Sequence, residues 1–230
     1  MKLLSVSNTK TRKGEAQGYL TFILHLAPGK LSGFQVCPGA SKGCLSACLN
    51  TAGRGRFNPV QDARVRKTRK LFEDRAGFMG ELVGDIESAE RKANRGGMVP
   101  VFRLNGTSDI RWETIPCTRD GERFPNVMEA FPHLTFYDYT KLPNRRNIPA
   151  NYHLTFSRSE SNENRLAGVV RRGLNVAVVF AGDLPETYRG LPVVSGDDTD
   201  LRFLDPKGCI VGLTAKGEAK GDTSGFVVGG

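Results

Sequence analysis

The fold of this chain is decided by residues 18–48, GYLTFILHLAPGKLSGFQVCPGASKGCLSAC. Residues 18–26 form an apolar, β-prone run that predicts a strand. Cys37, Cys44 and Cys48 follow it in a loop rich in glycine and small residues. Three thiolates so close together can converge on one metal centre, and such soft ligands favour an iron–sulfur cluster or zinc. The stretch therefore predicts a strand whose following loop holds a metal.

The same cysteines have two plainer interpretations. A buried cysteine is often only a small apolar side chain, and Cys44 and Cys48 would lie one helical turn apart, where a disulfide or redox pair is the second alternative. The five cysteines are an odd number, and residues 1–6 lack the apolar core of a secretory signal. No apolar run approaches the roughly 20 residues of a membrane span. We therefore expect a cytoplasmic protein without disulfides and without a membrane partner.

The composition is that of one globular domain with a moderate excess of positive charge. Hydrophobic residues make up 39% of the chain, and 33 Lys and Arg stand against 24 Asp and Glu, for a net charge of +9. The basic residues are spread along the chain, with local groups at 64–69, 145–146 and 171–172. Such a charge suits a nucleic acid or phosphorylated partner and is equally typical of a solvated surface. We expect one domain over residues 1–222 and a flexible tail over 223–230.

Further apolar runs alternate with helical patterns along the rest of the chain. From residue 58, apolar residues recur at helical intervals as far as residue 93, with an interruption expected near residues 77–80. Short helices are expected near residues 126–130 and 164–172. Five more strands are expected at residues 99–104, 134–139, 152–156, 176–180 and 209–213.

This alternation predicts a parallel sheet with helices outside it. Six strands are too few for a closed eight-stranded barrel, so we predict an α/β fold built as a partial (β/α)6 TIM-like barrel, with an open doubly wound sheet as the alternative. Polar residues follow the strands at their carboxyl ends, where the active sites of such barrels lie. They are Asn105, Gly106, Ser108, Asp109, Asp138, Lys141, Ser157, Arg158 and Ser159.

Several of these polar residues also have a structural interpretation. Asn105 begins a common Asn-Gly turn, and Asp109 can cap a helix. Arg158 can pair with Glu160 or Glu163 instead of a ligand. From the residues alone, both the binding and the structural interpretations stay open.

Four motifs occur in order along the chain: Cys37-Pro38-x-Ala40 with Cys44 and Cys48, Arg103-x-Asn105-Gly106-x-Ser108-Asp109, Tyr137-Asp138-Tyr139-Thr140-Lys141 and Phe156-Ser157-Arg158-Ser159. Together they resemble the phage and mobile-element family called gene product 88. The layout of first strand, cysteine loop, long helix and further β/α units also resembles the radical S-adenosylmethionine enzymes. Those enzymes space their cysteines as C-x3-C-x2-C, whereas the spacing here is C-x6-C-x3-C.

The likeness to radical S-adenosylmethionine enzymes implies an iron–sulfur enzyme. In that case Cys37, Cys44 and Cys48 bind a 4Fe–4S cluster, whose open iron takes S-adenosylmethionine. The loop after the second strand, with Asn105, Gly106, Ser108 and Asp109, is expected to hold the methionyl amine. The other implied partners are an electron donor and an unknown substrate, for which the charge makes a nucleotide or nucleic acid suitable. The remaining expected cofactor contacts are Asp138, Lys141, Ser157, Arg158 and Ser159.

Two competing hypotheses need no radical chemistry. In the first, zinc or a structural cluster stabilises a non-enzymatic nucleic-acid-binding protein; in the second, a degenerate barrel acts through protein contacts alone. Structural zinc takes four ligands, and Cys117 is the candidate for the fourth, whereas Cys209 opens an apolar strand and is expected in the core. The acidic residues Asp197, Asp198 and Asp200 form a weak divalent-metal pattern, and we expect them in a solvated turn instead.

Overall fold

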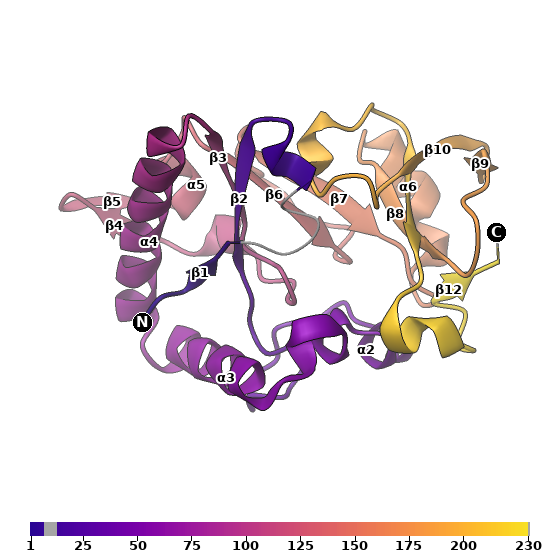
Figure 1. Ribbon diagram of the computed structural model, residues 1–230, viewed down its shortest axis with the longest axis horizontal. Coiled ribbons are helices and arrows are strands. Elements are labelled where there is room, and N and C mark those ends of the chain that lie inside the picture. Colours follow the sequence, from indigo (N-terminus) through magenta and orange to yellow (C-terminus); the bar gives the residue numbers. More distant parts are fainter. Residues whose placement is uncertain (7–12, 230) are drawn as a thin grey trace.

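A ten-stranded sheet runs through the molecule in a computed structural model that describes residues 1–6 and 13–229 (Figure 1). Its strands are β1 (Leu4–Ser5), β2 (Tyr19–Leu24), β3 (Val99–Arg103), β6 (Thr135–Thr140), β7 (Tyr152–Ser157), β8 (Val176–Phe180), β9 (Thr187–Tyr188), β10 (Leu191–Ser195), β11 (Ile210–Thr214) and β12 (Val227–Val228). The order across the sheet is β1-β2-β3-β6-β7-β8-β11-β10-β9, and β12 pairs with β8.

The six strands predicted from apolar runs are confirmed as β2, β3, β6, β7, β8 and β11. Each is parallel to the next one along the chain. The two ends of the sheet are short antiparallel additions, β1 beside β2 and β9 beside β10. The fold is therefore a mixed α/β architecture around a large, mostly parallel sheet. A closed sheet is absent from the described residues, so the predicted TIM-like barrel is not confirmed.

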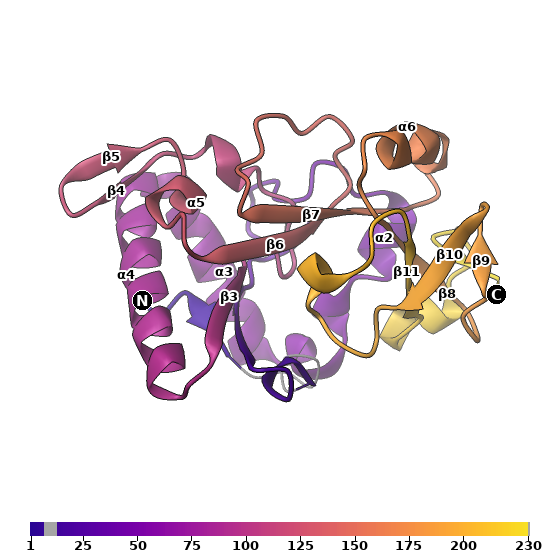
Figure 2. The same ribbon diagram turned by 90° about the horizontal axis from the view of Figure 1, so that it is seen from above.

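Alternation along the central strands gives the sheet two distinct faces, one of which carries a row of phenylalanines. Phe22, Phe102 and Phe136 on neighbouring strands stack with ring centroids 5.5 and 5.4 Å apart. Helix α4 (Arg75–Arg95) covers this face with a buried stripe that includes Phe78 and Leu82 (Figure 2). Because successive side chains of a strand point to opposite faces, the residues between the phenylalanines face away from α4.

The long helical pattern forms two helices, α3 (Asn58–Glu73) and α4, that part at Asp74. The break lies a few residues before the expected one at residues 77–80. Asp74 has φ −138° and ψ 68°, and its carboxylate accepts the backbone N–H of Gly77 at 2.9 Å. A side chain that caps the second helix therefore fixes the junction, and the glycines lie inside α4.

Shorter elements complete the connections. The cysteine loop contains α2 (Lys42–Ser46), and the expected short helices appear as α5 (Val127–Ala130) and α6 (Leu166–Arg171). A hairpin of β4 (Cys117–Arg119) and β5 (Glu122–Phe124) was not anticipated, because three-residue strands give too little alternation.

The C-terminal residues expected to form a flexible tail pack against the sheet instead. Phe226 is buried, and Val227 and Val228 pair in parallel with the carboxyl end of β8. Strand β7 pairs with β8 only as far as Ser157, so β12 takes the position beside β8 that β7 leaves. Gly230, the last residue of the expected tail, lies outside the described residues.

Candidate functional site

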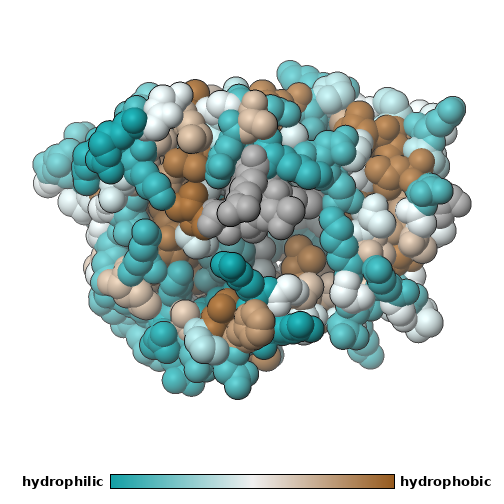
Figure 3. Space-filling view, in the orientation of Figure 1, coloured by the Kyte–Doolittle hydropathy of each residue, from teal (hydrophilic) through white to brown (hydrophobic). Residues whose placement is uncertain are grey.

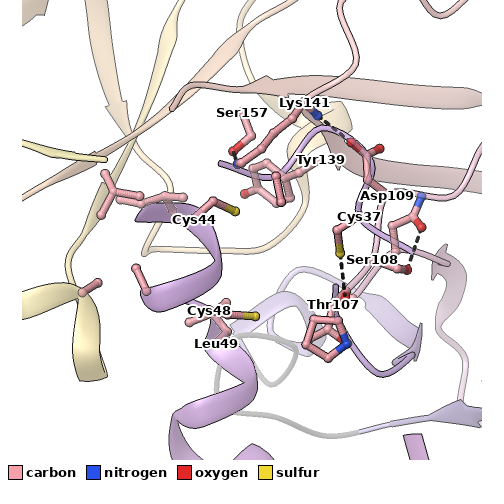
Figure 4. A pocket seen from close by; sticks show the side chains of 18 of the residues that line it. Cys37, Cys44, Cys48, Leu49, Thr107, Ser108, Asp109, Tyr139, Lys141 and Ser157 are labelled. Carbon is pink, nitrogen blue, oxygen red and sulfur yellow. Dashed lines mark hydrogen bonds between the residues drawn. The ribbon is translucent and has the colours of Figure 1, made fainter. Parts of the chain in front are cut away.

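The carboxyl ends of the parallel strands open onto one cavity of about 320 Å³ (Figure 4). Arg103 of β3, Tyr139 of β6, Ser157 of β7, Val179 of β8 and Leu213 of β11 supply one wall. The cysteine loop supplies another. A cavity of this size at this end of a parallel sheet has the dimensions and the position of a small-molecule site.

All three loop cysteines line this cavity. Cys37, Cys44 and Cys48 are half-buried free thiols, and Figure 4 shows their sulfurs pointing into the same space from different sides. The Cys37 thiol donates to the Thr107 carbonyl at 3.7 Å and accepts the N–H of Gly29 at 3.4 Å. The fold thus brings together the three residues predicted as ligands.

Burial favours the protonated form of two of these thiols, Cys37 and Cys48. Burial raises the pKa of Cys37 to about 11, and nearby thiolates at Cys48 and Cys44 would raise it further. Burial also raises the pKa of Cys48, against the pull of the Arg64 guanidinium. A cation bound at Cys37 and Cys48 would favour their thiolate forms.

Helix α2, which carries Cys44, is held at its N-terminus by a carboxylate from another part of the chain. Ser41 caps the helix by accepting the N–H of Cys44 at 3.1 Å. Glu160, just after β7, accepts the Ser41 hydroxyl at 2.8 Å and the N–H of Gly43 at 2.9 Å. Glu160 therefore fixes the cysteine helix to the sheet.

The C-terminal segment braces the same helix from its other side. Phe226 packs with Ala47 and Cys44 in a small apolar cluster and also lines the cavity. Arg158, predicted as a ligand, donates to the carbonyls of Gly225 and Phe226 and pairs with Glu163. Of its two interpretations, the pairing with Glu163 is the one present, and Arg158 does not line the cavity.

The Asn105 loop is shaped by its own hydrogen bonds. The Asn105 side-chain oxygen accepts from Ser108 Oγ at 2.8 Å, Ile110 N–H at 2.9 Å and Trp112 Nε1 at 3.2 Å. A Cβ on Gly106 would lie 2.6 Å from Ile23 Cγ2, so the glycine permits close approach to β2. Asn105, Gly106 and Ser108 reach the cavity, and Asn105 acts there by holding the loop in place.

Asp109 and Lys141 are the polar groups best placed to meet a ligand. Asp109 Oδ2 accepts the Lys141 N–H at 2.8 Å, whereas its buried Oδ1 has no hydrogen-bond partner and lies 3.7 Å from Arg145 Nη1. Burial raises the pKa of Asp109. The Lys141 ammonium donates to Ser157 Oγ at 2.6 Å and lies 5.3 Å from the centroid of the Phe226 ring. A carboxylate and an ammonium thus face one cavity.

A buried ion pair in the cavity wall was not identified from the sequence. Arg103 Nη1 lies 3.0 Å from Asp200 Oδ2, and the guanidinium lies 4.8 Å from the centroid of the Tyr139 ring. Tyr137 donates to the same carboxylate at 3.4 Å. Asp200 was expected in a solvated turn, and this was wrong because Arg103 neutralises it. An arginine inside an apolar strand was the signal that sequence reasoning passed over.

Asp138 and Ser159 are fully buried and lie outside the cavity lining. Asp138 accepts from Asn105 N–H and Tyr152 OH, each at 2.8 Å. Burial raises the pKa of Asp138 to about 7. The Ser159 N–H donates to Asn162 Oδ1 at 2.7 Å, and its hydroxyl lies 3.2 Å from the Ser161 hydroxyl. Both residues therefore support the site from behind.

The remaining cysteines lie apart from the three in the loop. Cys117 is buried in the core cluster that includes α4, and Cys209 is buried in a small cluster with Ala177 of β8 and Val211 of β11. Across residues 1–6 and 13–229, no group of three or more His, Cys, Asp or Glu side chains is arranged to hold a single metal ion. In the same ranges no helix has the length and apolar character needed to cross a membrane.

Fold and site together define an α/β protein with a thiol-lined cavity at the carboxyl edge of a mostly parallel sheet. The family model described as Gene product 88 matches residues 2–230, and the chain belongs to this family. The match confirms the first resemblance drawn from the four motifs, whereas the likeness to radical S-adenosylmethionine enzymes stays a prediction. No curated protein and no solved structure matches the chain.

Proposed function

We propose that the protein is an iron–sulfur enzyme of the radical S-adenosylmethionine type, built on a partial (β/α)6 barrel. The observation that carries the proposal is that the free thiols of Cys37, Cys44 and Cys48 face one cavity at the carboxyl ends of parallel strands. Each cysteine of a 4Fe–4S centre binds a different iron. Thiols placed around a cavity suit such a centre better than zinc, whose four ligands lie within about 2.3 Å of one ion.

The chain's own residues have separable roles in this proposal. When bound, a reduced cluster together with S-adenosylmethionine supplies one-electron cleavage of a sulfonium bond. Asp109 lines the cavity with a carboxylate that suits an amine, and Lys141 with Ser157 offers donors to a carboxylate. Tyr139 and Leu49 line the same cavity and limit the access of water. The electron donor and a host-cytoplasmic location stay predictions.

Anaerobic purification with quantitation of iron, sulfide and zinc tests the proposal. We expect a brown protein with about four irons per chain and a broad absorption band near ~400 nm. Cys44→Ser should lose the band, and Cys117→Ser, which changes a cysteine outside the cavity, should keep it. Loaded protein should then cleave S-adenosylmethionine after reduction.

A colourless protein with one zinc, or with no metal under anaerobic conditions, would contradict the cluster. Cluster loading without cleavage of S-adenosylmethionine would instead leave a structural iron–sulfur protein. In either case the non-enzymatic alternative, a nucleic-acid-binding protein, becomes the better account of the basic charge.

A further inference from the structure

The net positive charge of the chain is concentrated in the connection that carries the cysteines. Residues 16–72 contain nine Lys and Arg and one acidic residue, Asp62, and the rest of the chain contains 24 basic and 23 acidic residues. This segment therefore has an excess of eight basic residues, whereas the rest of the chain has an excess of one. Residues between 28 and 49 of this segment line the cavity. Lys30 and Lys42 lie within that stretch, and the other seven basic residues follow it in the chain.

Within this segment, residues 42–57 form what we call the basic rim. Lys42, Arg54 and Arg56 are exposed, and none of them is ion-paired to a carboxylate within the described part of the chain. The first acidic residue before the rim is Glu15 and the first after it is Asp62. An anionic partner would therefore reduce the charge repulsion within the basic rim.

The basic rim also exposes apolar side chains at the edge of the cavity. Leu45 is 46% exposed and Leu49 is 57% exposed, and both line the cavity. Phe57 is 54% exposed, with the Arg56 guanidinium 6.0 Å from its ring centroid. Figure 3 shows brown apolar atoms among teal ones over the lower part of the molecule, where α2 and α3 lie in Figure 1. Exposed apolar side chains beside cations that lack an ion-pair partner suit a ligand that has both flat apolar parts and anionic parts.

Hydrogen bonds hold the basic rim in one shape. A Cβ on Gly55 would lie 3.0 Å from the Leu49 carbonyl oxygen, so the turn that carries the arginines folds back on the turn that carries Leu49. Gln61 of α3 donates to the carbonyls of Asn50 at 3.1 Å and Gly55 at 2.6 Å. The backbone turn that carries the two arginines and the turn that carries Leu49 therefore keep a fixed spacing.

We propose that the basic rim binds a single-stranded nucleic acid, whose phosphates contact Lys42, Arg54 and Arg56 while one nucleotide enters the cavity between Leu45 and Leu49. A strand of this kind supplies repeated anions together with flat apolar bases, the combination that the rim and the cavity mouth offer. A duplex would keep its bases stacked away from the cavity. This inference rests on the proposed function, because it names the substrate class of the same cavity.

The test is fluorescence anisotropy of a short labelled single strand, as RNA and as DNA, over a salt series from about 50 to 200 mM. Arg54→Ala combined with Arg56→Ala should weaken binding and reduce the slope of log K against log salt by about 1.4, or 0.7 per lost phosphate contact. The matched control is Arg91→Ala combined with Arg95→Ala, which removes two exposed charges from α4 and should leave the slope unchanged. Phe57→Ala should weaken binding about tenfold at constant slope, because a stacked base is lost.

Binding should be measured with the loaded protein and also with a variant carrying Cys37→Ser, Cys44→Ser and Cys48→Ser. Rim-dependent binding by the cysteine variant, or by a chain that takes up no iron, would support this inference even if the cluster proposal fails. Equal effects of the rim and α4 variants, or tighter binding of a duplex of the same sequence, would overturn it. Rim-dependent binding to phosphatidylserine vesicles without binding to the single strand would overturn it in favour of a lipid surface.

Discussion

Glu160 gives the most direct test of how the fold holds the cysteine helix. Its carboxylate accepts the Ser41 hydroxyl at 2.8 Å and the Gly43 N–H at 2.9 Å. A hydrogen bond to a charged group contributes about 1.5–3 kcal/mol, and these two are partly exposed, so we take the lower value for each. Glu160→Ala should then destabilise the docked form of α2 by roughly 3 kcal/mol, which is roughly a 100-fold increase in its opened population.

Amide hydrogen exchange measures this opening directly. The N–H of Ala47 donates to the Gly43 carbonyl at 2.9 Å, and this bond must break before the amide exchanges. We expect Ala47 to exchange roughly 100-fold faster in Glu160→Ala, and iron loading to fall with it. Glu186→Ala removes an exposed carboxylate elsewhere and serves as the control. An unchanged exchange rate at Ala47 in Glu160→Ala would refute the idea that this carboxylate anchors α2.

Three further changes test the packing behind the site. Gly106→Ala should lower the free energy of unfolding in urea by about 1–3 kcal/mol, because its Cβ would lie 2.6 Å from a β2 side chain, whereas Gly84→Ala on an open helix face should be neutral or stabilising. Burial raises the pKa of Asp138 to about 7, so the folded chain holds this proton more tightly than the unfolded chain does. The resulting stabilisation of the folded state is complete below the pKa of Asp138 in the unfolded chain and is lost as pH rises through 7. The free energy of unfolding should fall by roughly 2 kcal/mol between pH 5 and 8, and a slope that persists in Asp138→Asn would contradict this assignment. Arg103→Ala should lower the free energy of unfolding by about 3–5 kcal/mol, because it leaves the Asp200 carboxylate without its ion-pair partner. Replacing Arg103 by Met and Asp200 by Leu together should recover most of that loss. A double variant as unstable as the single one would show that the loss comes from packing.

The six parallel strands were accessible from the sequence because each is a short, largely apolar run. A parallel strand buried on both faces is apolar along its whole length, and residues 176–180 and 99–102 are of this kind. The same reasoning placed the polar strand ends at one edge, since parallel strands end together. Curvature and closure of the sheet depend on twist and on the packing of connections, which no local pattern records. The barrel was therefore the part of the fold prediction that was not confirmed.

Side-chain pairings across long stretches of chain were not accessible. Arg103 and Asp200 lie 97 residues apart and meet only because β3 and the segment after β10 fold to the same side of the sheet. Glu160 reaches Ser41 across 119 residues. For Arg158, the sequence offered a ligand role and a pairing with Glu163, and only the folded chain distinguished them. Local pattern identifies which residues end a strand, and tertiary packing decides whether they face a cavity or a neighbour.

The connection between β2 and β3 carries the excess positive charge, the three loop cysteines and the mouth of the cavity. The thiols and the rim cations share short turns that α3 and Glu160 hold in place. A ligand that bridges the rim and the cavity would therefore add contacts on both sides of the same turns, and should slow hydrogen exchange at Ala47 as well as bind. Metal on the thiols would stabilise those turns from within. Binding at the rim and loading of the cysteines are thus expected to reinforce one another, because each restricts the motion that the other must overcome.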